Sequence, residues 1–181
     1  VTIPYKREVM QYLDEISDLA REAGAVNTIV NKNGRLAGYN TDCGGMKMLI
    51  DRMGIDLKGK KAFIAGSGGT SLTAAAVCRS LGAGEVVRAS RSGRNGALTY
   101  EEAYKASSDA ALLINTTPAG MYPDVDSIPF DIDRFDSPEG VLDVIYNPLA
   151  TRLVQGARER GIRAGNGLYM LVGQAVLACG L

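Results

Sequence analysis

Two polar segments, each placed after a strand-like run, have residue types suited to binding a phosphorylated ligand. The run 61–65 leads into Gly66-Ser67-Gly68-Gly69-Thr70, and the next such run ends in Ser90-Arg91-Ser92-Gly93-Arg94. Glycines between a strand and a helix let backbone N–H groups approach a pyrophosphate at the positive end of the helix. Arginine after the second strand favours a 2′-phosphate on the adenosine ribose, where an acidic residue would favour a free hydroxyl. Together the segments predict an NADP site rather than an NAD site.

The glycine loop by itself is a modest signal. Ser71 stands at the third glycine position of the dinucleotide-binding pattern, and glycine-rich turns also join strands and helices that bind nothing. The loop lies at the head of a strand–helix–strand unit, however, with Arg91 and Arg94 roughly 20 residues further on. This arrangement favours the nucleotide interpretation.

Composition narrows the chemistry, because the 181-residue chain has no histidine. Ser-His-Asp and Cys-His catalysis are therefore excluded, and we expect no metal site, since histidine is the commonest metal ligand. Acid–base chemistry must come from Lys, Asp, Glu, Tyr or Cys side chains. Cys43, Cys78 and Cys179 lack CxxC spacing, so we expect small core residues in a reducing cytoplasm.

The charge balance bears on partners. With 20 basic and 20 acidic residues the net charge is zero, which argues against nucleic acid or an anionic membrane as a general partner. No apolar run approaches the ~20 residues that span a bilayer. We therefore expect neither a nucleic-acid partner nor a membrane partner. With the cysteine usage this favours a cytoplasmic protein, and the sequence leaves open whether it is a monomer or a homodimer.

The first 54 residues must position part of any site. Residues 1–3 are typical of the end of a strand, and apolar residues at helical spacing predict an amphipathic helix over 4–21. Asn33-Gly34 predicts a hairpin turn between strands at 26–31 and 35–40. A helix over 43–53 would end at Gly54. Because the chain lacks an initiator methionine and a partner strand before residue 1, we expect a fragment whose upstream segment is missing.

From Lys60 the pattern alternates between strand-like and helix-like runs. The expected strands are 61–65, 85–90, 110–115, 140–145 and a short one at 162–165, and the expected helices are 70–81, 99–107, 150–160 and, last and apolar, 168–179. Such alternation predicts an α/β fold with a parallel sheet and right-handed crossovers.

Three motifs precede the predicted nucleotide domain: VTIPYK at 1–6, GAVNT at 24–28 and GYNTD at 38–42. Taken singly, Lys6 is compatible with a solvated lysine, Asn27 with a polar strand edge and Asp42 with a helix N-cap. In this order, and followed by NTTPAGM at 115–121, DVIYNP at 143–148 and NGLYMLVGQA at 166–175, they resemble the shikimate dehydrogenase family over nearly the whole chain.

This resemblance implies roles for individual residues. Lys6 and Asp42 match the catalytic lysine and aspartate of the family. The substrate contacts map onto Thr2, Asn27, Tyr146 and Gln174, and the cofactor contacts map onto the loop 66–70, the segment Ser90–Arg94, Val144 and Gly167. Without the resemblance, Tyr146 could be a loop-packing aromatic, Gln174 a polar residue in a helix contact and Met170 a core residue.

Two departures from the family pattern matter. The upstream Ser-x-Ser motif that binds the substrate carboxylate is absent from this chain, and Ser90-Arg91-Ser92 stands in place of Asn-Arg-Thr. The arginine is retained, so the NADP interpretation stands, with Arg94 as a second candidate for the phosphate.

The resemblance implies an enzyme that reversibly reduces 3-dehydroshikimate to shikimate with NADP. The expected architecture is a Rossmann-like parallel-sheet NADP domain at 43–167 plus a partial α/β substrate domain made of 1–42 and 168–181. Two alternatives remain open: a paralogue that also uses quinate, and a nucleotide-binding fragment without turnover, because the carboxylate-binding serines are absent.

Overall fold

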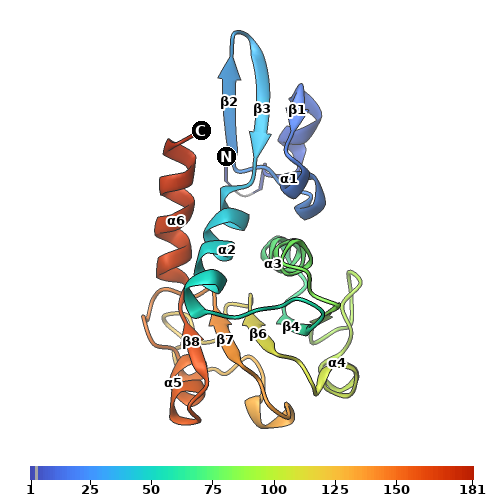
Figure 1. The fold of residues 1–181 in the computed structure, drawn as a ribbon, viewed down its shortest axis with the longest axis vertical. Helices are drawn as coiled ribbons and strands as arrows, with labels where there is room; N and C mark the ends of the chain where they lie inside the picture. Colours follow the sequence, from blue (N-terminus) through green and yellow to red (C-terminus); the bar gives the residue numbers. More distant parts are fainter. Residues whose placement is uncertain (3) are drawn as a thin grey trace.

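The computed structural model describes residues 1–2 and 4–181, and in this part of the chain the strands form two sheets (Figure 1). The larger sheet has the strand order β5-β4-β6-β7-β8, with all neighbouring strands parallel. Its strands are β4 (Lys61–Ala65), β5 (Glu85–Ala89), β6 (Leu112–Asn115), β7 (Gly140–Asp143) and β8 (Arg163–Gly165). The predicted α/β fold with a parallel sheet is confirmed.

Helices cover both faces of this sheet, so its strands are apolar almost throughout. Ala62 and Ile64 face a core shared with α2 (Thr41–Met53) and α3 (Gly69–Ser80). Phe63 and Ala65 point to the other face, where they meet α4 (Tyr100–Ser107) and α5 (Arg152–Glu159). Both layers bring loops to the carboxyl ends of β4, β6 and β7, where parallel sheets bind ligands.

The smaller sheet has the order β1-β3-β2. Its hairpin consists of β2 (Thr28–Lys32) and β3 (Arg35–Tyr39), and the turn residues Asn33 and Gly34 have φ values of 55° and 88°. Positive φ at both turn residues matches the twist of the strands. The predicted hairpin is therefore confirmed, and β1 (Glu15–Ile16) pairs parallel to β3 at the edge of the sheet.

Helices α2 and α6 (Gly167–Cys179) lie side by side (Figure 1). They approach closely through glycines, since a Cβ on Gly173 would lie 3.2 Å from the Cα of Gly45 and a Cβ on Gly45 would collide with the backbone carbonyl of Met170. Gly54, with φ of 65°, ends α2 as predicted. The start of α2 and the middle of α6 are thereby held together.

The predicted helix over 4–21 is wrong. The segment instead forms turns at 4–7, a 3₁₀ helix η1 (Glu8–Tyr12), strand β1 and a short helix α1 (Asp18–Ala23). Asp14 exchanges backbone and side-chain hydrogen bonds with Leu36 at 2.9 and 2.7 Å, which draws the chain into the sheet. This tertiary pairing outweighs helical periodicity.

The remaining predicted elements agree with the structure to within about two residues, the usual uncertainty of helix ends. Two further predictions need correction. Val1 and Thr2 lie in no strand, and Ile3 lies outside the described residues. Cys179 is exposed, whereas Cys43 and Cys78 are buried as expected. Among the described helices, which also include the short η2 (Ile132–Arg134), none is long and apolar enough to cross a membrane.

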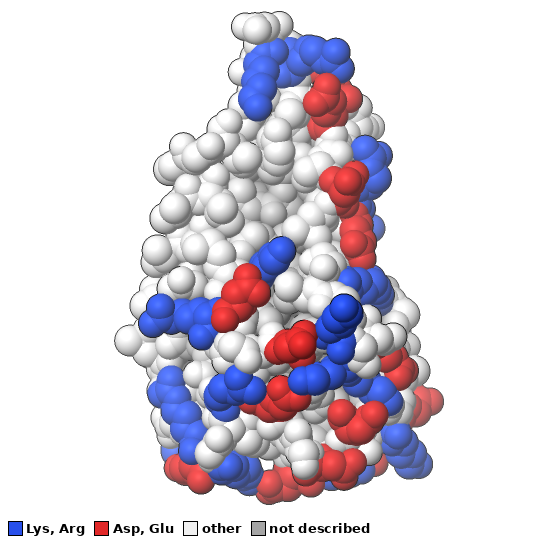
Figure 2. Space-filling view, viewed as in Figure 1, with Lys and Arg blue, Asp and Glu red and all other residues white. Residues whose placement is uncertain are grey.

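Charged side chains are unevenly spread. Figure 2 shows them crowded over the part of the molecule that holds the parallel sheet, while the surface over α6 is white. The sequence explains this, because residues 167–179 contain no charged residue.

Candidate active site

A hollow of about 450 Å³ lies where the N-terminal segment, α2, α3 and α6 meet. Its lining includes Lys6, Asp42, Gly69, Thr70, Val144, Tyr146, Gly167, Met170 and Gln174. The topology explains this gathering. Thr70 lies in the first turn of the helix after β4, Val144 and Tyr146 follow β7, and Asp42 lies in the first turn of the helix after the hairpin. Residues more than a hundred positions apart in sequence therefore face one space.

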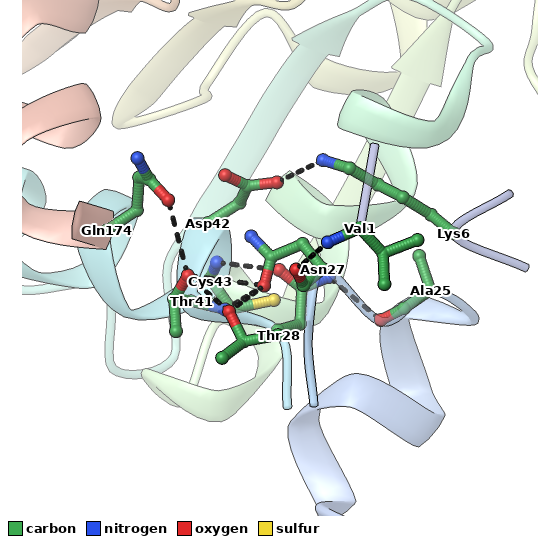
Figure 3. Close-up of polar contacts among 10 residues, drawn as sticks. Val1, Lys6, Ala25, Asn27, Thr28, Thr41, Asp42, Cys43 and Gln174 are labelled. Carbon is green, nitrogen blue, oxygen red and sulfur yellow. Dashed lines mark hydrogen bonds and ion pairs between the residues drawn. The ribbon is translucent and has the colours of Figure 1, made fainter. Parts of the chain in front are cut away.

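Lys6 and Asp42 form an ion pair in this hollow, with Nζ 2.7 Å from Oδ2 (Figure 3). Their side chains are 27% and 25% exposed, so both remain accessible to a ligand. An ammonium group has three donors, and the aspartate uses one of them. The pair can therefore deliver a proton and accept a hydrogen bond at neighbouring points.

Asp42 is not the N-cap of α2. Asn40 caps the helix, with its Oδ1 accepting from Cys43 N at 3.2 Å, and its Nδ2 donates to the Ala25 carbonyl at 3.1 Å. These bonds fix residues 24–27 against the start of α2 and leave the Asp42 carboxylate for Lys6. The carboxylate lies in the first turn of the helix, where the helix dipole favours negative charge.

Cys43 lies beside Asp42 but takes no part in this chemistry. Burial, together with the charge of Asp42, raises the pKa of its thiol to about 12. A thiol with so high a pKa is neither a nucleophile nor a proton donor near neutral pH.

The side chains of Asn27 and Gln174 both contact Thr41, the residue before Asp42. Asn27 Oδ1 accepts from Thr41 N at 2.8 Å, and Thr41 Oγ1 lies 3.4 Å from Gln174 Oε1 (Figure 3). Gln174 lines the hollow, whereas Asn27 is not among the residues that line it. Sequence reasoning assigned no role to Thr41, although its place between Asn40 and Asp42 in the third motif was a usable signal.

Val144 and Gly167 meet at the mouth of the hollow. Gly167 N donates to the Ile145 carbonyl at 2.9 Å, and any Cβ at Gly167 would collide with the carbonyl of Val144. Glycine is therefore required there for close backbone contact. Tyr146 is 52% exposed, so packing alone does not account for it, and Met170 both lines the hollow and packs against the core.

A buried carboxyl supports the loops around this site. Asp143 is fully buried and accepts from Thr151 Oγ1 at 2.7 Å, Asn115 Nδ2 at 3.0 Å and Ile145 N at 3.1 Å. Burial raises the pKa of this carboxyl despite the three hydrogen bonds. The network joins the ends of β6 and β7 to the start of α5, and sequence reasoning gave it no function.

A second hollow of about 760 Å³ lies on the other side of the glycine loop and is lined by Gly66, Ser67 and Gly68 together with Ser90, Arg91 and Ser92. Gly66 has φ of 131°, and a Cβ there would collide with the side chain of Thr116. The loop therefore needs glycine at this position to join β4 to α3. The strand-end arginine and the glycine loop share one cavity, as an elongated dinucleotide requires.

Two of the candidate residues lie apart from these hollows. Thr2 is exposed, its carbonyl accepts from Tyr5 N at 3.0 Å, and it lines neither hollow. Arg94 is likewise exposed and lines neither. The structure thus gathers the other candidate residues around the two hollows, with Asn27 joined to the first through Thr41.

Comparison with known proteins identifies the family. The chain is 40% identical over 192 residues to the NADP-dependent shikimate dehydrogenase of Geobacillus kaustophilus, covering 98% of this chain and 70% of that protein. The chain belongs to the shikimate dehydrogenase family. The model of the shikimate dehydrogenase substrate binding domain matches residues 1–29.

Solved structures of other shikimate dehydrogenases agree in fold. A chorismate mutase/shikimate 5-dehydrogenase fusion protein from Clostridium acetobutylicum gives a TM-score of 0.89 at 36% identity, covering 98% of this chain and 67% of that one. The Thermus thermophilus shikimate 5-dehydrogenase in complex with NADP(H) and shikimate gives 0.84 at 32% identity, covering 99% and 72%. This chain therefore spans about two thirds of these shikimate dehydrogenases.

Proposed function

We propose that this protein catalyses the reversible, NADP-dependent reduction of 3-dehydroshikimate to shikimate. The observation that carries the proposal is the Lys6–Asp42 pair, which faces a hollow that also reaches Gly69 and Thr70 at the start of α3. A proton donor and a nucleotide-binding loop on one cavity are the two parts that ketone reduction by a nicotinamide cofactor requires.

The residues around the glycine loop fit NADP. Added Cβ atoms at Gly68 and Gly69 would meet nothing within 4 Å, so a pyrophosphate has space to approach the start of the 12-residue helix α3. Ser90 Oγ is buried and has no hydrogen-bond partner among the described residues. With Arg91 beside it in the second hollow, this hydroxyl suits the ribose end of a phosphorylated dinucleotide.

When bound, NADPH supplies a hydride to the ketone carbon, and negative charge develops on the ketone oxygen. In our proposal Lys6 donates a proton to that oxygen and takes it back in the oxidative direction. Two of its three ammonium donors remain for substrate, because Asp42 uses one. With no histidine in the chain, lysine is a suitable donor.

Asp42 has two roles in this scheme. It holds the Lys6 ammonium in place at 2.7 Å, and its second oxygen accepts a hydrogen bond from the ring hydroxyl beside the reacting carbon. Asn27, Gln174 and Tyr146 supply further neutral hydrogen bonds, which give discrimination because an analogue lacking a hydroxyl leaves buried polar groups unpaired.

We further propose that residues 1–42 and 168–181 form the substrate domain and 43–167 the nucleotide domain. The two separate sheets support this division. A cytoplasmic location, a monomeric or homodimeric state, and the substrate role of Thr2 also remain proposals.

The direct test is an absorbance assay at 340 nm of purified protein with shikimate and NADP⁺. We expect shikimate oxidation with NADP⁺ to exceed the rates with NAD⁺ and with quinate. Binding of NADPH without oxidation of shikimate or quinate would support the nucleotide-binding alternative instead, and comparable rates with quinate would support the paralogue.

A further inference from the structure

Thr41 occupies an unusual place in the site. It is the first residue of α2, it is 5% exposed, and it lies between the side chains of Asn27 and Gln174 immediately before Asp42 (Figure 3). Its backbone N–H contacts the Asn27 amide, and its hydroxyl contacts the amides of both Asn27 and Gln174. The position of its single hydroxyl hydrogen therefore affects which atoms those amides present to a ligand.

The orientation of the Asn27 amide follows from its contacts. The Thr41 backbone N–H lies 2.8 Å from one terminal atom of Asn27, and a backbone N–H only donates, so that atom is the oxygen. Thr28 Oγ1 donates to the same oxygen at 3.0 Å. These two bonds use both lone pairs of Oδ1. Within residues 1–2 and 4–181, Nδ2 of Asn27 has no partner and is not buried, which leaves it available to a ligand.

The Gln174 amide has no such backbone partner. Thr41 Oγ1 lies 3.2 Å from Asn27 Oδ1 and 3.4 Å from Gln174 Oε1, and its one hydrogen serves only one of them well. Thr28 Oγ1 also lies 3.4 Å from Thr41 Oγ1. Because Asn27 Oδ1 already accepts from Thr41 N and Thr28 Oγ1, we assign the Thr41 hydroxyl hydrogen to Gln174 Oε1. The Gln174 nitrogen then points away from Thr41, as Figure 3 shows.

We propose that Thr41 is a positioning residue that fixes the Gln174 amide, so that Gln174 and Asn27 both present N–H donors to the substrate. This inference rests on the proposed function. A ring hydroxyl that donates its hydrogen to Asp42 keeps lone pairs that accept hydrogen bonds from such donors. If Gln174 presented its oxygen instead, two acceptors would compete for one hydroxyl hydrogen.

The test compares Thr41→Val with Thr41→Ser. Valine removes the hydroxyl but keeps the backbone N–H that binds Asn27, whereas serine keeps both. We expect Thr41→Val to lower kcat/KM for shikimate about tenfold, the effect of one neutral hydrogen bond. Thr41→Ser should restore the value to within about threefold of the wild type.

A double-mutant cycle separates positioning from a general structural effect. If Thr41 acts through Gln174, adding Thr41→Val to Gln174→Ala should change kcat/KM by less than about twofold. A further tenfold loss in the Gln174→Ala background would overturn the inference while leaving the proposed function intact.

A second readout needs no turnover. Nitrogen-15 relaxation of the Gln174 side-chain amide, assigned with Gln174→Ala, should show greater mobility in unliganded Thr41→Val than in the wild type. Equal mobility in the two proteins would overturn the inference even if the wild type proved inactive, an outcome that would separately refute the proposed function.

Discussion

The Lys6–Asp42 pair has about a quarter of each side chain exposed. Ion pairs with this degree of solvent access contribute little to the free energy of unfolding, because water screens the charges and ordering two side chains costs entropy. A contribution to stability therefore explains the presence of this ion pair poorly. Its position facing the hollow explains it better.

Replacing Lys6 by alanine should lower kcat by a factor of about 10² to 10⁴, the usual contribution of a positioned proton donor. The affinity for NADPH, measured by fluorescence titration, should change little, because the glycine loop is untouched. Lys47→Ala is the matched control, since Lys47 is an exposed lysine on α2 outside the hollow. Near-normal turnover in Lys6→Ala would contradict a catalytic role for this lysine.

Arg91→Gln should weaken binding of NADP much more than binding of NAD, because only NADP carries the 2′-phosphate. A loss of one charge-assisted hydrogen bond corresponds to roughly ten- to a hundredfold in Kd. Arg94→Gln is the informative comparison, since Arg94 lies outside the second hollow, and we expect a smaller effect. Equal losses of NADP and NAD affinity in Arg91→Gln would contradict the 2′-phosphate assignment.

At the level of elements, the Asp143 network connects the loops that follow β6 and β7. Asn115 Oδ1 accepts from Thr117 N at 2.9 Å while its Nδ2 donates to Asp143. These loops contribute Tyr146 to the first hollow and Thr117 to the second. One buried cluster thus supports both halves of the site.

The raised pKa of Asp143 gives a pH prediction with a defined sign. The folded protein binds the Asp143 proton more tightly than the unfolded chain does. The protonated carboxyl therefore stabilises the fold fully at pH values below the pKa of Asp143 in the unfolded chain, and this stabilisation is lost as pH rises through its pKa in the folded protein. Asp143→Asn has no such loss, because asparagine can still accept from Ile145 N and Asn115 while donating to Thr151. The Tm of the variant minus that of the wild type should therefore increase as pH rises from about 3.5 to 7. A Tm difference that is constant over this range would contradict the assignment.

The strands and helices from residue 60 onward were predictable because the hydrophobic pattern of each segment indicates its type and local capping or turn residues mark its ends. Thr99 and Glu102 form a capping box at α4, for example, and the buried strands are almost wholly apolar. Residues 4–21 were not predictable in this way, since Asp14 pairs with Leu36, which lies in a strand 22 positions further along the chain. The contacts of Thr41 with Asn27 and Gln174 were also not predicted, because they join three segments that are separate in sequence.

At the scale of the whole molecule, the surface over α6 is an exposed apolar area. Leu171, Val172 and Val176 are 41%, 53% and 62% exposed along this helix, and Figure 2 shows a white surface where Figure 1 places α6. Exposed apolar patches of this kind favour contact with other apolar surfaces.

The polypeptide 1–181 should therefore increase the fluorescence of a hydrophobic dye such as ANS. The double substitution Val172→Lys and Val176→Lys should reduce that increase without lowering Tm, since lysine is a better helix former than valine. Gln155→Lys, on the exposed side of α5, controls for added positive charge. Undiminished dye fluorescence in the double variant would show that the dye does not bind the apolar surface of α6.

The glycine contact between α2 and α6 has a mechanical consequence. Asp42 lies in the first turn of one of these helices and Gln174 lies within the other, so the contact holds these two side chains at a fixed separation. Because α2 also packs against α3 in the core beside the parallel sheet, the close contact between α2 and α6 ties the position of Gln174 to the helix that begins at the glycine loop.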